Sequence, residues 1–320
     1  TGWLKCEAGV TLKAIIDTFA HRGFFPPVVP GTQHVSLGGA LANDIHGKNH
    51  HVAGTFADHV RQVELLTADG QVVVCDAENE TQLFNATAGG LGLTGLILTL
   101  EVKLTPIETP FIELESVRVE NLEQFFEVSG ESAGFSHTVS WIDCIKTGDG
   151  LGRGIFMRGR HADAQTAGDR SPSNKGPIAK VPIDAPNWAM NGLTMKLFNM
   201  AYFRKHPKGQ RNSIAHYGPF FFPLDAVGGW NRIYGKRGML QYQLVVPHDP
   251  QHAAVRSVLK EVTTSGHASF LSVIKEFGDQ CRPGLSFPMP GVTLALDFPN
   301  KGPDLYAMLE RLDRIVIEAG

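Results

Sequence analysis

Residues 38–60 read GGALANDIHGKNHHVAGTFADHV, and this stretch is the most informative part of the sequence about the class of fold. Gly38 and Gly39 lack Cβ atoms, so their backbone N–H groups are predicted to approach a ligand closely. Successive turn N–H groups, helped by the hydroxyls of Thr32 and Ser36, form a concavity suited to a pyrophosphate. A purely structural glycine turn is the alternative. A ligand is favoured by the polar cluster that follows, which is costly to bury without partners: His46, Lys48, Asn49, His50 and His51.

A second glycine-rich stretch, AGGLGLTGLI, covers residues 88–97. Its spacing is not the G-x-G-x-x-G of a Rossmann fold, and an apolar strand follows it rather than a helix. We therefore predict a backbone that passes close to a flat cofactor. The alternative is a bulged entry into the strand.

The remaining patterns of the first hundred residues predict a mixed fold. Residues 1–10 indicate a strand, and Thr11 can cap a helix whose apolar positions 12, 15, 16 and 19 share one face. RQVELLTADGQVVVCDA, residues 61–77, predicts a hairpin around an Asp-Gly turn. A short helix is expected over residues 80–87, with Leu83 and Phe84 on its buried side.

After Pro106 the segments FIELESVRV, HTVSWIDCI and RGIFMRGR alternate apolar and polar residues, as antiparallel strands with one wet face do. Further strands are predicted at 240–247, 268–278 and 292–299, and helices at 121–133, 250–264 and 303–318. Residues 162–192 are predicted to form a long mobile loop that gates the site. The fold class is α+β, with one domain over residues 1–105 and a second over 106–320, an antiparallel sheet backed by helices.

Composition narrows the class of protein. The chain has 320 residues, 42% hydrophobic and 19% charged, with a net charge of -3, so no nucleic-acid partner is expected. Its four cysteines form no C-x-x-C pair, so no metal site is expected. No apolar run reaches the ~18 residues of a membrane span, and no charged leader precedes an apolar stretch. We expect a protein of the cytoplasm, with or without peripheral membrane contact, or of the periplasm.

The motifs, taken in order, resemble the vanillyl-alcohol-oxidase superfamily of FAD-linked oxidases, which have a PCMH-type FAD-binding domain and include D-arabinono-1,4-lactone oxidase-like proteins. Within it, the chain resembles the decaprenylphosphoryl-β-D-ribose oxidase family over nearly its whole length. IHGKNHH (45–51) and SGHASFLSVIKEFG (265–278) are specific to that family, whereas the glycine runs are typical of the superfamily. Further matching segments are LLTADG (65–70), FPLDAVGGWNRIYG (222–235), LQYQLVVP (240–247) and LSFPMPGVTLALDFP (285–299).

The resemblance implies an FAD-dependent oxidoreductase. Hydride transfer to FAD would oxidise the 2-hydroxyl of decaprenylphosphoryl-ribose, or of a similar polyprenyl-phosphate sugar, to a keto sugar. A separate NADH-dependent short-chain reductase would complete the epimerisation, in the synthesis of cell-wall arabinan precursors. Residues 1–105 would then be the C-terminal part of the FAD-binding domain, and 106–320 the substrate domain.

Site residues are implied by the same resemblance, position by position. His46, Lys48 and Lys275 would be catalytic. The cofactor would contact Gly31, Ser36, Leu37, Gly38, Gly39, Asn43, Asp44, Ile45, His46 and Ile97. The substrate would contact Tyr217, Gln241, Gln243, Lys275 and Phe277.

Two alternatives stay open. The chain could be another FAD-linked sugar or alcohol oxidase that uses oxygen, or a truncated homologue without activity. The second follows from the family pattern, in which a phosphate-binding loop would lie upstream of Thr1 and a segment with a Tyr and a Lys beyond Gly320; we expect these 320 residues alone to hold FAD weakly. The side chain of Lys275 shares the strand parity of Leu271 and Val273, so it points either into the site or, near the strand end, out to solvent.

Overall fold

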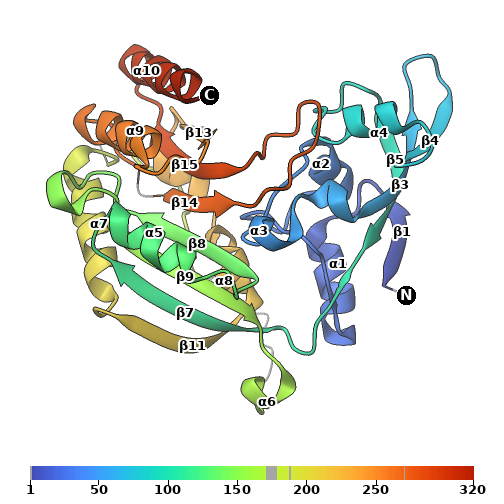
Figure 1. The fold of residues 1–320 in the computed structure, drawn as a ribbon, viewed down its shortest axis with the longest axis horizontal. Helices are drawn as coiled ribbons and strands as arrows, with labels where there is room; N and C mark the ends of the chain where they lie inside the picture. The colour runs from blue at the N-terminus through green and yellow to red at the C-terminus, as the bar shows by residue number, and fades with distance from the viewer. Residues whose placement is uncertain (1, 171–178, 187–188, 270) are drawn as a thin grey trace.

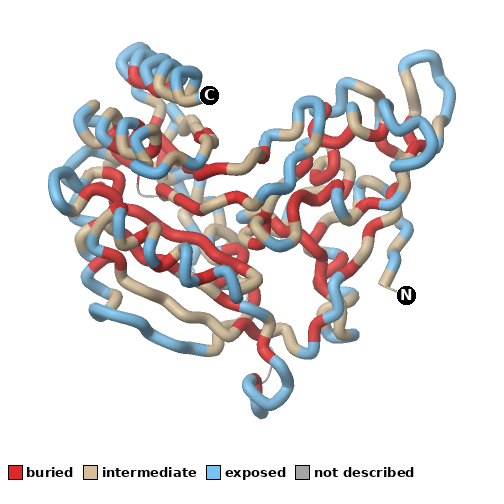
Figure 2. Tube along the Cα trace, in the orientation of Figure 1, coloured by how far each residue is buried: buried red, intermediate tan, exposed pale blue. Residues whose placement is uncertain are grey.

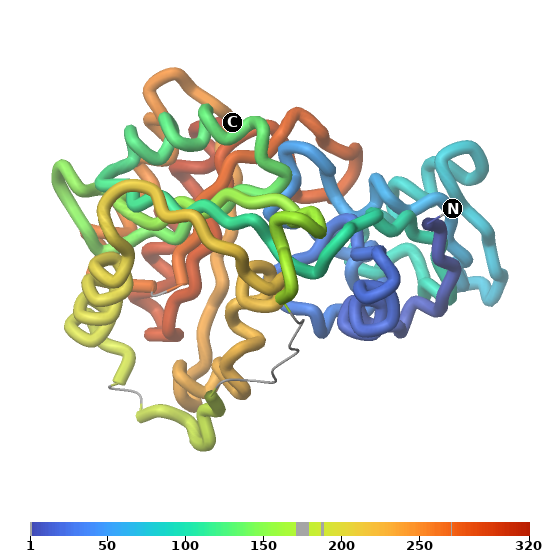
Figure 3. Tube along the Cα trace, turned by 90° about the horizontal axis from the view of Figure 1, so that it is seen from below, coloured from blue at the N-terminus to red at the C-terminus, as the bar shows by residue number. Residues whose placement is uncertain are grey.

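The computed structural model describes residues 2–170, 179–186, 189–269 and 271–320. It has two parts that lie side by side, each built on its own antiparallel sheet (Figures 1 and 3). The α+β fold class predicted from the sequence is confirmed. Among the described residues, no helix has the length and apolarity needed to cross a membrane.

The N-terminal part holds a four-stranded sheet in the order β1-β5-β3-β4. Its elements are β1 (Trp3–Glu7), α1 (Leu12–Phe19), β2 (Phe24–Phe25), α2 (Leu37–Ala42), α3 (His50–Ala53), β3 (Val60–Leu66), β4 (Val72–Asp76), α4 (Thr81–Thr87), β5 (Leu96–Lys103) and β6 (Thr105–Pro106). The predicted hairpin is β3–β4, with Val63 opposite Cys75. Thr11 caps α1 by accepting a hydrogen bond from the Ala14 N–H, as predicted.

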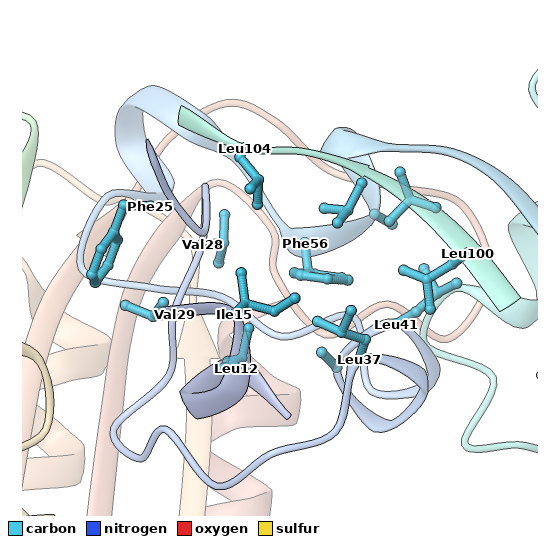
Figure 4. Packing of buried hydrophobic residues seen from close by; sticks show 14 of the residues in the cluster. Leu12, Ile15, Phe25, Val28, Val29, Leu37, Leu41, Phe56, Leu100 and Leu104 are labelled. Carbon is cyan, nitrogen blue, oxygen red and sulfur yellow. The ribbon is translucent and has the colours of Figure 1, made fainter. Parts of the chain in front are cut away.

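One hydrophobic core joins these elements. Side chains from α1, α2 and β5 meet Phe25 of β2 and the loop residues Val28 and Val29 around the fully buried Phe56 (Figure 4). The apolar face of α1, Leu12, Ile15 and Ile16, is buried here because those positions recur with helical spacing. The core therefore fixes the Pro-rich loop and α2, which carry residues of the site.

The C-terminal part holds a seven-stranded antiparallel sheet in the order β11-β7-β9-β8-β14-β15-β13. Its strands are β7 (Phe111–Val119), β8 (His137–Ile142), β9 (Gly154–His161), β11 (Gln210–His216), β13 (Met239–Val246), β14 (Ser272–Phe277) and β15 (Gly291–Pro299), and β10 (Ala179–Lys180) pairs with β12 (Val227–Gly228) outside this sheet. Its helices are α5 (Leu122–Gly130), α6 (Ala164–Ala167), α7 (Gly192–Lys205), α8 (Tyr217–Phe221), α9 (Ala253–Thr264) and α10 (Pro303–Ala319).

The two faces of this sheet have different neighbours. Leu294, Leu296 and Phe298 of β15 pack with α5, α9 and α10, so the sheet is buried beneath these helices (Figure 2). Alternate residues of the same strand, Thr293 and Asp297, point to the other face, toward the N-terminal part. Strand periodicity thus separates core residues from site residues.

Three features differ from the sequence-based predictions. The strand β8 was expected to have one wet face, but all six of its residues are buried, because helices cover one face and α7 with the N-terminal part covers the other. The helix α7 and the strand β11 were not predicted. The predicted loop 162–192 contains α6 and β10, and part of it, 171–178 and 187–188, lies outside the described residues; its gating role stays a prediction.

Candidate functional site

A cavity of about 590 Å³ lies between the two parts of the molecule. This volume is typical of small-molecule sites, which span roughly 300–1,000 Å³. The N-terminal part contributes Gly31, Gly39, Asn43, Asp44, Ile45, His46 and Lys48, and the sheet face contributes Val139, Gln241, Gln243, Val273, Lys275, Thr293, Ala295 and Asp297. The mixture of apolar walls and converging polar groups defines a candidate active site.

A continuous chain of hydrogen bonds crosses this cavity between the two parts. The Gln243 amide nitrogen lies 2.8 Å from His46 Nε2, and the Lys275 amine nitrogen lies 2.9 Å from His46 Nδ1. Lys275 also donates to the backbone oxygen of Gly47. His46 is therefore held on both ring nitrogens by strands of the C-terminal part.

The direction of these bonds follows from Thr293. Its hydroxyl donates to the Leu244 carbonyl at 2.8 Å, so its oxygen accepts from the Gln243 amide nitrogen at 3.3 Å. The amide is thereby oriented with its nitrogen toward His46 Nε2, which must accept. The imidazole proton then sits on Nδ1, and only an uncharged Lys275 amine can accept it.

The environment of Lys275 agrees with an uncharged amine. Only 8% of the residue is exposed, and burial, with the nearby charge of Lys48, holds its pKa well below the usual value. Among the described residues, no carboxylate pairs with it to restore the ammonium form. Burial also lowers the pKa of His46 well below its usual range, so the imidazole is neutral at pH 7.

Lys48 supplies the positive charge on the other side of the cavity. Burial lowers its pKa to about 8, which leaves it mostly protonated at neutral pH. Its amine donates to the Phe221 carbonyl and lies 5.7 Å from the centre of the Phe220 ring. This cation raises the potential of the cavity without contacting Lys275 directly.

The polar cluster at residues 45–51 is also a joint between the two parts. The Lys48 carbonyl accepts from the Thr138 N–H, His51 Nε2 lies 2.8 Å from the Phe135 carbonyl, and the Gly278 N–H donates to His50 Nδ1. Much of the cluster's burial is therefore compensated by protein partners rather than by a ligand. Of the polar residues in this cluster, His46 and Lys48 line the cavity, so these two can take part in catalysis as predicted.

The glycine turn at 36–39 differs from the prediction. The N–H groups of Leu37 and Gly38 donate to the carbonyls of Val10 and Ala8, and the Gly39 N–H donates to the Ser36 hydroxyl at 3.2 Å. None of these three N–H groups is left to form an anion-binding concavity. A Cβ at Gly38 would lie 2.8 Å from the Ala8 Cβ, so this glycine is needed for close packing of α2.

Six of the predicted contact residues do not line the cavity. Leu37 and Ile97 belong to the N-terminal core, and Ser36 and Gly38 serve α2 as described. Tyr217 packs against Phe25 and His216 in the same core, because α8 faces inward there. Phe277 lies behind the cavity, with its ring 4.9 Å from that of His46 and 4.4 Å from that of His50.

The second glycine stretch, 88–97, fits the alternative of tight backbone packing. A Cβ at Gly89, which has φ +77°, would lie 2.9 Å from the backbone of Ser286, and one at Gly95 would lie 2.4 Å from the Leu66 carbonyl. The pairing of β3 with β5 is shifted at Glu64–Leu65, next to this entry. Gly89 thus lets the β14–β15 loop approach the N-terminal part, Gly95 lets β5 approach β3, and neither lines the cavity.

That loop, residues 278–290, reaches across to α2 and α4 (Figure 1). Arg282 donates to Asp58 at 2.6 Å and lies 3.9 Å from the buried carboxylate of Asp44. Ser286 donates to the same oxygen of this carboxylate, Asp44 Oδ2, at 2.5 Å. We call Arg282, Ser286, Asp44 and Asp58 the clasp.

Among the residues that line the cavity, sequence reasoning missed two polar side chains, Asp297 and Thr293. Asp297 is buried, burial raises its pKa, and Gln241 donates to its Oδ1 at 2.8 Å, whereas Oδ2 has no hydrogen-bond partner among the described residues. Thr293 orients Gln243, as shown above. A signal existed in VTLALDFP, where a carboxylate interrupts an apolar strand at the parity of Thr293.

Comparisons with known proteins agree with this geometry. Residues 1–76 match the FAD binding domain family. Decaprenylphosphoryl-beta-D-ribose oxidase of Mycolicibacterium smegmatis is 38% identical, with 100% of this chain and 71% of that protein covered. An uncharacterized protein of the mprA 5' region of Streptomyces coelicolor is 31% identical over 97% of this chain and 87% of its own length. Cytokinin dehydrogenase 5 of rice, Oryza sativa subsp. japonica, is 34% identical over 28% of this chain and 17% of its own length.

The fold and the matches define an FAD-dependent oxidoreductase with a PCMH-type FAD-binding domain. The chain belongs to the decaprenylphosphoryl-β-D-ribose oxidase family. The cavity fits a flavin, since it combines apolar walls with buried polar groups still able to hydrogen-bond, such as Asp297 Oδ2. Gly31, Gly39, Asn43, Ile45 and His46 are the lining residues placed to hold it.

Proposed function

We propose that the protein oxidises the 2-hydroxyl of a ribose linked to a polyprenyl phosphate, giving a 2-keto sugar. The observation that carries the proposal is the buried Lys275 amine, hydrogen-bonded to His46 inside a cavity that amide and carboxylate side chains line. The printed name of the 38% identical relative supports the choice of substrate.

FAD, when bound, accepts the hydride from the carbon that carries the hydroxyl. The chain must then remove the hydroxyl proton, and the lone pair of the Lys275 amine is the basic site for it. The substrate hydroxyl competes with the His46 Nδ1–H for this lone pair. A positioned general base typically contributes 10²- to 10⁴-fold to the rate.

The other cavity residues orient the sugar. The amides of Gln241 and Gln243 and the free oxygen of Asp297 offer donors and acceptors to ribose hydroxyls. Lys48, protonated at neutral pH, stabilises negative charge that develops on the reacting oxygen or on the cofactor. These groups come from both parts of the molecule, so the cavity is complete only when the joint at residues 45–51 is closed.

The partner reaction follows from the chemistry of the product. A 2-keto sugar becomes the arabinose epimer when a second enzyme delivers hydride to its other face, and an NADH-dependent short-chain reductase is the proposed partner. The pair would supply arabinose donors for cell-wall arabinan.

Anaerobic mixing of the flavin-loaded protein with polyprenyl-phosphoryl ribose tests the proposal. We expect the flavin absorbance to bleach, and the 2-deoxyribose analogue, which lacks the reacting hydroxyl, to leave it unchanged. Bleaching by the 2-deoxy analogue, or none by the ribose substrate, contradicts the proposal. Reoxidation of the reduced protein with oxygen and with a quinone then tells an oxygen-using oxidase from a dehydrogenase.

A further inference from the structure

The outer face of α7 is unusually apolar for a surface helix. Its buried positions, Met195, Asn199 and Phe203, recur every four residues and anchor it to the sheet. The outer face exposes Leu193 at 65%, Leu197 at 51% and Phe198 at 47%. Three large exposed hydrophobic side chains on one helix indicate a surface that contacts something else.

The sequence segment that contains α7 carries charges of one sign. Residues 185–224 contain no Asp or Glu, although acidic residues outnumber basic ones in the whole chain by 32 to 29. The same segment contains five basic residues, all exposed: Lys196, Arg204, Lys205, Lys208 and Arg211. The partner that complements this surface is therefore both apolar and anionic.

The helix α7 also lies on the sheet face that carries the cavity. Val139 of β8 lines the cavity, and Trp141, two residues along the same strand and on the same face, packs against Phe203 and Tyr202 of α7. Asn199 donates to Asp143 at 2.9 Å just beyond the strand. Two residues of a strand span only about 7 Å, so α7 packs on the same sheet face as the cavity, close to the Val139 that lines it.

We propose that the outer face of α7 docks the protein on an anionic membrane surface, with Leu193, Leu197 and Phe198 inserted among the lipids and the basic residues against the headgroups. Exposed apolar side chains flanked by basic ones are one feature that helices bound to a membrane surface share. The proposal goes beyond the oxidation itself and does not depend on the identity of the substrate. Docking in this way brings the cavity next to the lipid headgroups.

Co-sedimentation with vesicles tests this assignment without any substrate or turnover. We expect the wild-type protein to bind vesicles of phosphatidylglycerol and phosphatidylcholine, and to bind pure phosphatidylcholine at least tenfold more weakly. The double variant Leu197→Ser/Phe198→Ser should lose at least tenfold in affinity for the anionic vesicles. The matched control is Ile317→Ser, which alters an aliphatic side chain of α10 that is 77% exposed and should bind as the wild type does.

A second variant tests the charges. Each basic residue at an anionic surface contributes about 1 kcal/mol, or roughly fivefold in affinity, so Lys196→Gln/Lys205→Gln should bind about 25-fold more weakly. All the substituted side chains are exposed, and unchanged thermal unfolding verifies that the variants are folded. The proposal is overturned if the wild-type protein does not bind anionic vesicles, or if both α7 variants bind them as tightly as the wild type does. Either result would leave this face to a protein partner. Because the vesicle assay uses no sugar, its failure is distinct from failure of the proposed oxidation.

Discussion

Two of the contacts that join the halves of this molecule, the clasp and the contact of Lys275 in the cavity, differ in how charge is balanced. In the clasp, Arg282 lies between the carboxylates of Asp58 and Asp44, so cation and anions compensate each other. In the cavity, Lys275 meets His46 and Gly47 but no carboxylate among the described residues. The clasp therefore fixes the two parts relative to each other, whereas the cavity contact leaves the Lys275 amine with a basic lone pair that can accept a proton.

The difference follows from the free energy of burying a cation. A paired arginine stays charged and rigid, and breaking the pair leaves a buried carboxylate uncompensated. An unpaired buried lysine loses its proton instead, which makes it a base at neutral pH. The following predictions test whether the clasp contributes mainly to stability and the contact of Lys275 mainly to activity.

The largest effect is expected for Lys275→Met, which keeps the volume of the side chain and removes its lone pair. Substrate-driven flavin reduction should slow at least 100-fold, because a general base is lost. The flavin spectrum and the thermal unfolding temperature should stay near those of the wild type. Reduction within threefold of the wild-type rate would mean that another group takes the proton.

The clasp is tested by Arg282→Gln, which leaves the buried Asp44 without its cation. Denaturant unfolding should show a loss of about 2 kcal/mol, below the roughly 3–5 kcal/mol for breaking a fully buried pair, because Asp58 is 37% exposed and Arg282 lies 3.9 Å from Asp44. The control Arg256→Gln breaks the pair with Glu123, which is 55% exposed, and should cost less than about 0.5 kcal/mol. If Arg282→Gln instead slows flavin reduction and leaves the free energy of unfolding unchanged, the division of roles between the two contacts is wrong.

A smaller effect is expected for Thr293→Val, which removes the hydroxyl that orients Gln243. With the amide free to turn its oxygen toward His46, the imidazole proton moves to Nε2 and Nδ1 accepts from Lys275. The protonated amine is then favoured, and flavin reduction at neutral pH should fall about tenfold, or ~1.4 kcal/mol. Thr293→Ser, which keeps the hydroxyl, should restore most of the rate; equal rates for the Val and Ser variants would rule out this relay.

The smallest effect concerns the glycine turn. Gly38→Ala places a Cβ 2.8 Å from that of Ala8 and should destabilise the protein by about 1 kcal/mol, as overpacking does. Gly9→Ala, where the added Cβ meets nothing within 4 Å, is the control and should be nearly neutral. Because the Gly38 N–H is already bonded to Ala8, flavin affinity should change less than twofold. A large loss of flavin with unchanged stability would restore the original ligand-binding prediction.

Much of this arrangement could be predicted from the sequence. Periodicity located the β3–β4 hairpin, α1 and the strands that carry Gln243 and Lys275, because apolar spacing reports directly which face is buried. The cluster containing His46 stood out because polar residues are costly to bury. Strand parity also placed Lys275 on the same face as Val273, which the structure shows.

The rest depended on tertiary contacts that no local pattern contains. Gly38 suggested a ligand-binding turn, but its N–H is used by Ala8, which lies thirty residues earlier in the chain. Tyr217 was assigned to the substrate, although α8 turns it into the core. The role of Thr293 depends on the register of β15 with β13. Thr293 pairs with Val245, which is two residues from Gln243 on the same strand, and sequence alone does not give that register.

The proposed mechanism depends on the protonation state of Lys275, and the pH dependence of anaerobic flavin reduction is its most direct test. Because burial lowers the pKa of Lys275 and its lone pair faces the His46 Nδ1–H, the amine gains a proton as pH falls through that lowered pKa. The proposed mechanism predicts a rate that falls on the acid side as Lys275 gains a proton, with this acid limb absent in Lys275→Met, and that also falls above about pH 8 as Lys48 loses its proton. A wild-type rate that keeps rising toward pH 10, as for an ordinary lysine, would contradict it.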